Sequence, residues 1–198
     1  EVRAMFEKLG FGRDAGTGFP GESAGRLPNH RRWTDIERAA FAYGYGLTVT
    51  PLQLAASYLT IASGGIKRDV SLIVGAERND QRIYSREVAD QLKQILASVV
   101  TDGTAKKAAI QGYAVAGKTG TARKMGESGY EDTRHLAFFA GMAPVDQPRL
   151  VCVVLINEPK GESYGGGATA APVFSRVMQN ALRILNVPPK VQVKGEAA

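Results

Sequence analysis

The segment Gly117-Lys118-Thr119-Gly120-Thr121 combines the residue types that acyl-transfer chemistry needs. The Lys118 ammonium can hold a carboxylate and bias nearby proton transfers, and the hydroxyls of Thr119 and Thr121 can donate to the same carboxylate. Gly120 has no side chain, so an extended peptide can approach the backbone there. On a strand edge, such a peptide adds as a further strand, and a backbone N–H can point at the oxyanion of a tetrahedral intermediate. The bland alternative is a chance Lys-Thr-Gly on a solvated edge strand.

The other reactive side chains are few and scattered. Cys152 is the only cysteine, so the chain forms no internal disulfide, and His30 and His135 are isolated in the sequence. No Cys/His cluster has metal-ligand spacing, so we expect no metal and no cofactor.

The basic charge of the chain lacks the pattern of a nucleic-acid site. The formal net charge is +6, but the basic residues form only short clusters, at His30-Arg31-Arg32 and Arg123-Lys124. Because no aromatic-interleaved basic stripe accompanies them, we expect no nucleic-acid partner. Hydrophobic residues make up 44% of the chain, which is enough to bury a core.

Capping signals and apolar periodicity predict helices mainly in the first half of the chain. Thr34 with Glu37 and Thr50 with Gln53 match the capping box. Helices are predicted over residues 2–9, 34–42, 51–63, 85–100 and 172–185, with one or two further turns in 104–110. The predicted buried faces are Leu52, Ala55, Ala56, Leu59 and Thr60 on the third helix, and Val88, Leu92, Ile95, Leu96 and Val99 on the fourth.

Strand patterns follow in the second half. A short hairpin is predicted from residues 70–76 and 82–84, and longer strands from 116–124, 134–143 and 150–157. The last of these is rich in Val, Leu and Ile and is predicted to be buried on both faces. The order predicts an α+β fold in which helices cover an antiparallel sheet. Residues 191–198 are expected to be a disordered tail.

Six segments give the chain a resemblance to class B penicillin-binding proteins of the cell-division type, the penicillin-binding protein 3 group. These segments, which agree in order and spacing, are Arg32–Ala39, Gly44–Ala55, Gly112–Lys124, Phe139–Pro144, Tyr164–Gly167 and Ala171–Phe174. The Lys-Thr-Gly triplet is weak alone, but it belongs to the signature that these proteins share with class A β-lactamases. The resemblance implies that residues 1–190 are the C-terminal portion of a transpeptidase domain with a penicillin-binding, serine β-lactamase-like fold.

The resemblance also implies a role for each residue of the motif. Lys118, Thr119 and Gly120 would be the third motif of the transpeptidase site, and the backbone N–H of Thr121 would be one oxyanion-hole donor. The hydroxyls of Thr119 and Thr121 would bind the terminal carboxylate of a peptidoglycan stem peptide, or of a β-lactam that mimics it. Tyr45 and Tyr164 would line the cleft, although core packing or an interface explains them nearly as well.

Two departures limit the resemblance. The chain contains no Ser-x-x-Lys and no Ser-x-Asn motif; Thr104-Ala-Lys-Lys107 and Thr121-Ala-Arg-Lys124 fit only Thr-x-x-Lys. In the family both motifs lie N-terminal to the matched region, so we expect that the nucleophile serine is absent from this chain and that the chain alone is inactive. Gly165 stands where relatives often have an aromatic residue, which puts an aromatic wall beside Tyr164 in doubt.

The resemblance implies a full-length peptidoglycan D,D-transpeptidase of septal wall synthesis and a target of β-lactams. A serine β-lactamase or a β-lactam sensor domain is one alternative, and a non-catalytic module of a division complex is another. The implied partners are the D-Ala-D-Ala stem peptide, β-lactams, the N-terminal half of the same protein and membrane proteins of the division complex. The implied location is the periplasmic face of the bacterial inner membrane, with the anchor outside this chain.

Overall fold

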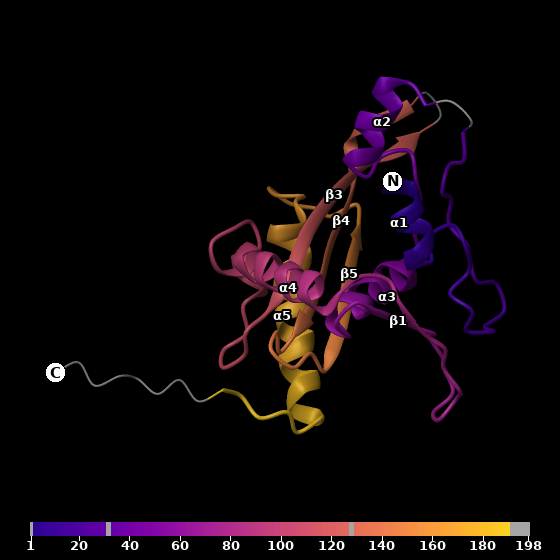
Figure 1. Cartoon of the computed structure of the whole chain (residues 1–198). Helices are drawn as coiled ribbons and strands as arrows, with labels where there is room; N and C mark the ends of the chain where they lie inside the picture. The colour runs from indigo at the N-terminus through magenta and orange to yellow at the C-terminus, as the bar shows by residue number, and fades with distance from the viewer. Residues whose placement is uncertain (1, 31–32, 127–128, 191–198) are drawn as a thin grey trace. The chain divides into compact units, whose positions relative to one another are not determined.

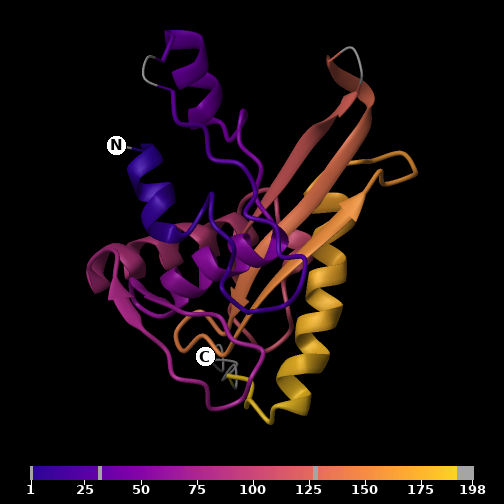
Figure 2. The ribbon, with the colours of Figure 1, turned by 90° about the vertical axis from the view of Figure 1, so that its right-hand side faces the viewer.

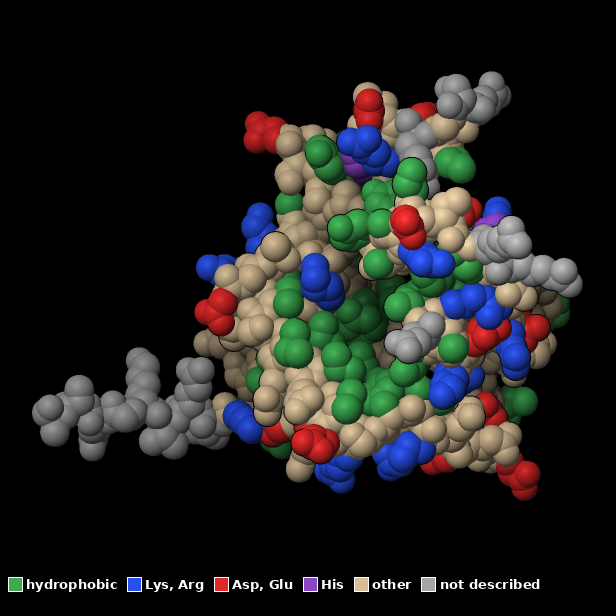
Figure 3. All heavy atoms as spheres, turned by 45° about the horizontal axis from the view of Figure 1, so that its top comes forward, with side chains coloured by type: hydrophobic (Ala, Val, Ile, Leu, Met, Phe, Trp, Pro, Cys, Tyr) green, Lys and Arg blue, Asp and Glu red, His purple; other side chains and the backbone are tan. Residues whose placement is uncertain are grey.

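The computed structural model describes residues 2–30, 33–126 and 129–190 of the chain (Figure 1). The chain divides into two compact units, Glu1–Arg86 and Glu87–Ala198. None of the helices in the described ranges is long and apolar enough to cross a membrane. On the face seen in Figure 3, Lys and Arg side chains are dispersed among acidic ones. The expected disordered tail, 191–198, lies outside the described residues.

The first unit contains three helices and a short hairpin: α1 (Val2–Leu9), α2 (Asp35–Ala42), α3 (Pro51–Ala62), β1 (Ile66–Arg68) and β2 (Asp80–Arg82). Both predicted capping boxes are confirmed. The Thr34 hydroxyl accepts from the Glu37 N–H, and the Thr50 hydroxyl accepts from the Gln53 N–H. Because these caps satisfy N–H groups that would otherwise lack a partner, adjacent residues fix where α2 and α3 begin.

The predicted buried face of α3 is wrong in part. Gln53, Ser57 and Thr60 are buried, whereas Leu52 is 37% exposed. Gln53 explains the difference, because its amide donates to the carbonyl oxygens of Arg13, at 2.6 Å, and Ala24, at 2.8 Å. The face that α3 buries therefore includes a polar side chain that satisfies distant backbone groups. A pattern of apolar residues does not predict this.

The short hairpin is present but displaced from the predicted strands. β1 pairs with β2 antiparallel, with Lys67 opposite Gln81, while residues 69–79 form the connection. The predicted strand at 70–76 is therefore wrong. Three apolar side chains in this connection are exposed: Leu72, Ile73 and Val74.

The second unit is a three-stranded antiparallel sheet with helices. It contains α4 (Arg86–Thr101, beginning at the boundary), the 3₁₀ turn η1 (Lys106–Ala108), β3 (Ala116–Gly126), β4 (Gly129–Ala143), β5 (Leu150–Asn157) and α5 (Gly166–Ile184). The strand order is β3-β4-β5, and α5 packs along the sheet (Figure 2). Phe139 on β4 and Phe174 on α5 are fully buried and in edge contact, with ring centroids 4.6 Å apart. The predicted α+β class and helix-covered antiparallel sheet are confirmed.

For β5 and α4, the predictions of which residues are buried are wrong in part. β5 is half-buried rather than buried on both faces, because only alternate residues, Leu150, Cys152, Val154 and Ile156, pack against the core. On α4 the buried residues are Ala89 and Val100, whereas Val88 and Ile95 of the predicted stripe are exposed.

The last helix begins six residues earlier than predicted, and Pro172 lies inside it. Proline costs a helix one N–H donor, so Pro172 favours a helix start at that point. The helix instead starts at Gly166, where the missing side chain allows close packing on the strands. A Cβ built on Gly166 would lie 2.3 Å from the Phe138 carbonyl oxygen. Tertiary packing outweighs the local signal.

Candidate active site

The Lys-Thr-Gly segment lies on β3, which is an edge strand of the described sheet. Lys118 pairs with Ala140 of β4, and Thr121 pairs with Ala137. Lys118 and Thr121 are exposed, and Thr119 and Gly120 are half-buried. The Lys118 ammonium donates only to the neighbouring Thr119 carbonyl oxygen, at 3.2 Å, among the contacts of the described residues. An edge strand leaves alternate backbone N–H and C=O groups without a strand partner, so β3 can accept an added strand.

The two threonine hydroxyls of the segment are held by other elements of the second unit. The Thr119 hydroxyl lies 3.0 Å from the Thr104 hydroxyl, and the Thr121 hydroxyl accepts from the Gly166 N–H at 3.2 Å. Because the Thr121 oxygen accepts in this bond, its own proton remains available for donation to a ligand.

Thr104 is a contact that the sequence analysis missed. In the sequence, Thr104 stands out only as the first residue of a Thr-x-x-Lys match. The structure places it between α4 and η1 rather than at the start of a buried helix. A Cβ on Gly167 would lie 2.3 Å from the Thr104 carbonyl oxygen, so α5 packs directly against this residue. Thr104 and Thr119 are 15 positions apart in the sequence, so no local pattern predicts their contact.

The space at Gly120 is not open, which corrects the reason given for this glycine. A Cβ there would lie 2.0 Å from the Phe138 ring, which packs across Gly120 from the paired strand. An aromatic ring placed over a strand glycine in this way stabilises the sheet. A peptide could therefore approach the edge of β3 but not the face of Gly120 that Phe138 fills.

Of the two tyrosines, Tyr164 is connected to the segment through Gly166. It comes two residues before Gly166, whose N–H contacts Thr121, and its ring stacks on His135 with centroids 3.9 Å apart and planes 16° apart. His135 is 9% exposed and Tyr164 is 53% exposed. No pattern in the sequence predicts that the isolated His135 forms this stack.

Tyr45 belongs to the first unit, where its ring is 39% exposed and its backbone N–H donates to the Ala40 carbonyl oxygen at 3.0 Å. Lys118 belongs to the second unit, and the place of Tyr45 in the cleft stays a prediction.

A group of charged residues joins the far ends of the three strands. Lys124 on β3 and Arg134 on β4 both bind Glu158, which follows β5, and Arg134 also binds Glu131. Hydrogen bonds from Lys124 and then Arg134 lower the pKa of Glu158 to about 2. The carboxylate of Glu158 is therefore ionised at any ordinary pH.

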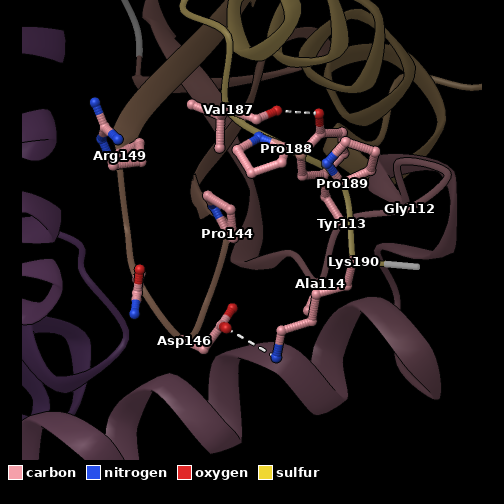
Figure 4. Close-up of a pocket in the computed structure, with 11 residues that line it drawn as sticks. Gly112, Tyr113, Ala114, Pro144, Asp146, Arg149, Val187, Pro188, Pro189 and Lys190 are labelled. Atoms are coloured by element: carbon pink, nitrogen blue, oxygen red, sulfur yellow. Dashed lines mark hydrogen bonds and ion pairs between the residues drawn. The ribbon is translucent and has the colours of Figure 1, made fainter. Parts of the chain in front are cut away.

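A separate cavity of about 270 Å³ lies at the other end of β3, beside the loop that precedes it (Figure 4). The Tyr113 hydroxyl donates to the Val187 carbonyl oxygen at 2.7 Å, and Lys190 forms an ion pair with Asp146 at 2.8 Å. The lysine hydrogen bond lowers the pKa of Asp146. No serine, threonine, cysteine or histidine is among the residues described as lining this cavity, so it lacks a nucleophile of the acyl-transfer kind.

The remaining candidates for chemistry are weak. Burial raises the pKa of the Cys152 thiol, which lowers its reactivity. Within the described ranges, no group of three or more His, Cys, Asp or Glu side chains could hold a metal ion.

Known proteins resemble the chain in sequence over most of its length. The sequence profile of the family described as "Penicillin binding protein transpeptidase domain" matches residues 1–179. The chain is 42% identical over 193 residues to the peptidoglycan D,D-transpeptidase FtsI of Escherichia coli K12, and 39% identical over 191 residues to the probable peptidoglycan D,D-transpeptidase PenA of Neisseria meningitidis. Each match covers 96% of this chain but only 33% of the relative.

A solved structure has the same fold. The transpeptidase domain of Burkholderia pseudomallei penicillin-binding protein 3, in its apo form, superposes with a TM-score of 0.86 at 40% identity, over 94% of this chain and 57% of that one. The chain thus spans about a third of the length of the curated relatives and somewhat over half of that solved domain. It belongs to the penicillin-binding protein transpeptidase domain family.

Proposed function

We propose that the full-length protein containing this chain is a peptidoglycan D,D-transpeptidase that cross-links stem peptides in septal wall synthesis. The observation that carries the proposal is the edge strand β3, which presents an exposed Lys118 and two threonine hydroxyls that other elements hold in place. Relatives that carry the name D,D-transpeptidase match nearly the whole chain, which supports the same reaction. Residues 1–190 are then the C-terminal portion of the domain.

In this proposal the chain binds and orients the substrate, and a serine outside it attacks. The serine oxygen adds to the carbonyl carbon between two terminal D-alanines, the peptide bond breaks, and D-alanine leaves with a proton on its nitrogen. An amine of a neighbouring stem then displaces the serine oxygen and forms the cross-link. A β-lactam would acylate the same serine, and its acyl-enzyme would persist because it hydrolyses slowly.

The residues of β3 and its neighbours have different roles in binding the substrate and stabilising the oxyanion. Lys118, Thr119 and Thr121 bind the terminal carboxylate, the free edge of β3 at Gly120 pairs with the peptide, and the backbone N–H of Thr121 donates to the oxyanion. The start of α5 adds favourable partial charge, because its Gly166 N–H lies against the Thr121 hydroxyl and helix N-termini attract anions. Tyr45 and Tyr164 line the cleft.

The proposed setting follows from the same relationship. The protein would act at the periplasmic face of the inner membrane, anchored by a segment outside this chain. It would pair with the N-terminal half of its own domain, bind stem peptides and β-lactams, and assemble with membrane proteins of the division complex.

Replacing Thr121 by proline in the full-length protein tests the oxyanion role. Because proline has no N–H, acylation by a fluorescent penicillin should slow by about a hundredfold or more. Thr121→Ser, which keeps both the N–H and the hydroxyl, is the matched control and should be acylated at close to the wild-type rate. Unchanged acylation of Thr121→Pro would remove the oxyanion role.

Two further measurements test the function itself. Rapid turnover of nitrocefin by the full-length protein would indicate a β-lactamase instead, and lack of acylation of the wild-type protein would favour a non-catalytic module. The 198-residue chain alone should show no mass shift with penicillin, because it contains no Ser-x-x-Lys motif.

A further inference from the structure

We propose that Glu158 is a positioning residue of the acylation site: it fixes the loop 158–165, and thereby holds Tyr164 beside Thr121. This inference rests on the proposed function, because it assigns Tyr164 to the wall of the same cleft. Glu158 itself touches no substrate in this proposal and acts through Tyr164.

The contacts of Glu158 join three elements at one carboxylate oxygen. Its Oε1 accepts from Lys124 Nζ at 2.5 Å and from the two Arg134 nitrogens Nε and Nη2 at 2.9 and 2.8 Å. Lys124 is on β3, Arg134 is on β4, and Glu158 directly follows the last residue of β5. Lys124 also donates to the Asn157 side chain at 3.0 Å. Charge-assisted hydrogen bonds of this kind are about twice as strong as neutral ones.

Glu158 is also where the loop leaves the sheet. Its N–H donates to the His135 carbonyl oxygen at 2.9 Å, which extends the β4–β5 pairing by one residue beyond Asn157. Its φ of 50° lies in the left-handed region, so the backbone turns away at this position. The side chain that holds the charges and the backbone that starts the loop therefore belong to one residue.

The rest of the loop has few other attachments. Glu162 and Ser163 are exposed, and a Cβ on Gly161 would meet nothing within 4 Å. The far end of the loop is held where the Gly166 N–H meets the Thr121 hydroxyl, and Tyr164 stacks on His135 just before it. With one end fixed at Thr121, the other end at Glu158 determines how firmly Tyr164 is held.

Loss of the Glu158 charge should weaken the attachment of the loop 158–165 to β3 and β4. The ammonium of Lys124 and the guanidinium of Arg134 meet at the same oxygen, so a neutral side chain leaves two like charges close together without their shared anion. The two cations then repel, and the loop start loses its anchor. The binding step should weaken, whereas the bond-forming step, which depends on the serine outside this chain and on the backbone N–H of Thr121, should not.

The test measures acylation of the full-length protein by a fluorescent penicillin, with the initial dissociation constant separated from the acylation rate constant. Glu158→Gln should raise the dissociation constant by about tenfold and change the rate constant by no more than about twofold, since misplacement of a binding wall costs affinity. Glu162→Gln removes an equal charge from an exposed residue of the same loop and should match the wild type. Glu158→Asp keeps the charge and should recover part of the affinity.

A double-mutant cycle decides whether Glu158 acts through Tyr164. If it does, Glu158→Gln should add nothing to the loss caused by Tyr164→Ala, because the wall that it holds is already gone. Independent, additive losses would overturn the inference, as would equal dissociation constants for Glu158→Gln and Glu162→Gln. If the wild-type protein is not acylated at all, the proposed function fails instead, and the two failures are distinguishable.

Discussion

The two ends of β3 are held by different kinds of interaction. At the start of the strand, Ala116 is fully buried and Gly117 lies against the Phe139 ring, which belongs to the apolar core. At the far end, Met125 is 70% exposed and the strand is held by ion pairs of Arg123 and Lys124. The proposed substrate-binding residues lie between the two ends.

The start of β3 is the rigid part of the proposed site. Close-packed apolar atoms resist displacement in every direction, so the start of β3 fixes Lys118 and Thr119 with precision. Ion pairs near the surface are weaker and depend on salt, so the far end of β3 is the more adjustable of the two. Substitutions at the core end should therefore cost the most stability, those in the middle of the strand less, and those at the charged end the least.

Removal of a core ring should have the largest effect, at the rigid end. Phe174 is fully buried and contacts Phe139, so Phe174→Ala leaves a cavity and should lower the free energy of unfolding by about 3–5 kcal/mol. Denaturant unfolding of the full-length protein measures the loss. Phe19→Ala, at a side chain that is 64% exposed, is the control and should cost little. A small loss at Phe174 would show that this end is not held by the core.

A methyl group on Gly120 should have an intermediate effect, in the middle of the strand. The Cβ would lie 2.0 Å from the Phe138 ring, so Gly120→Ala should cost about 1–3 kcal/mol through overpacking. Because the obstacle is a side chain, Phe138→Ala in the same protein should relieve the clash, and the double variant should be more stable than the sum of the two losses predicts.

Gly117→Ala provides a comparison with Gly120→Ala, because the atoms around the two glycines differ. Its Cβ would clash with the Phe139 ring and would also lie 2.6 Å from the Ala140 carbonyl oxygen, which is backbone that no substitution removes. Because Phe138 is not among the atoms nearest to this Cβ, Phe138→Ala should not rescue Gly117→Ala. Thermal unfolding of the three single and two double variants distinguishes the two glycines, and rescue at both positions would contradict this account of the packing.

The sequence could predict the features that rest on neighbouring residues. The capping boxes of α2 and α3 use residues three apart, and the strand that carries Lys118 follows from local composition and turn signals. The α+β order follows in the same way. These features depend on little else in the chain, so a local reading is sufficient.

The features that could not be predicted depend on contacts between distant residues. Gln53 is buried because it reaches Arg13, 40 residues away, and Thr104 meets Thr119 across 15 residues. The early start of α5 needs the strands that Gly166 packs on. His135 appeared isolated because its partner, Tyr164, comes from a loop that only the folded sheet brings near.

The smallest effect is expected at the adjustable end and depends on pH. Lys124 and Arg134 lower the pKa of Glu158 from 4.5 to about 2, so the ionised form is favoured in the folded state. The stabilisation is fully present above the unfolded pKa, near 4.5, and is lost as the pH falls through about 2. The unfolding free energy of the wild-type protein should thus decline between these values more steeply than that of Glu158→Gln. High salt should reduce the difference, because the group is near the surface. Parallel pH profiles for the two proteins would mean that the charges at this end of β3 contribute nothing to the stability of the fold.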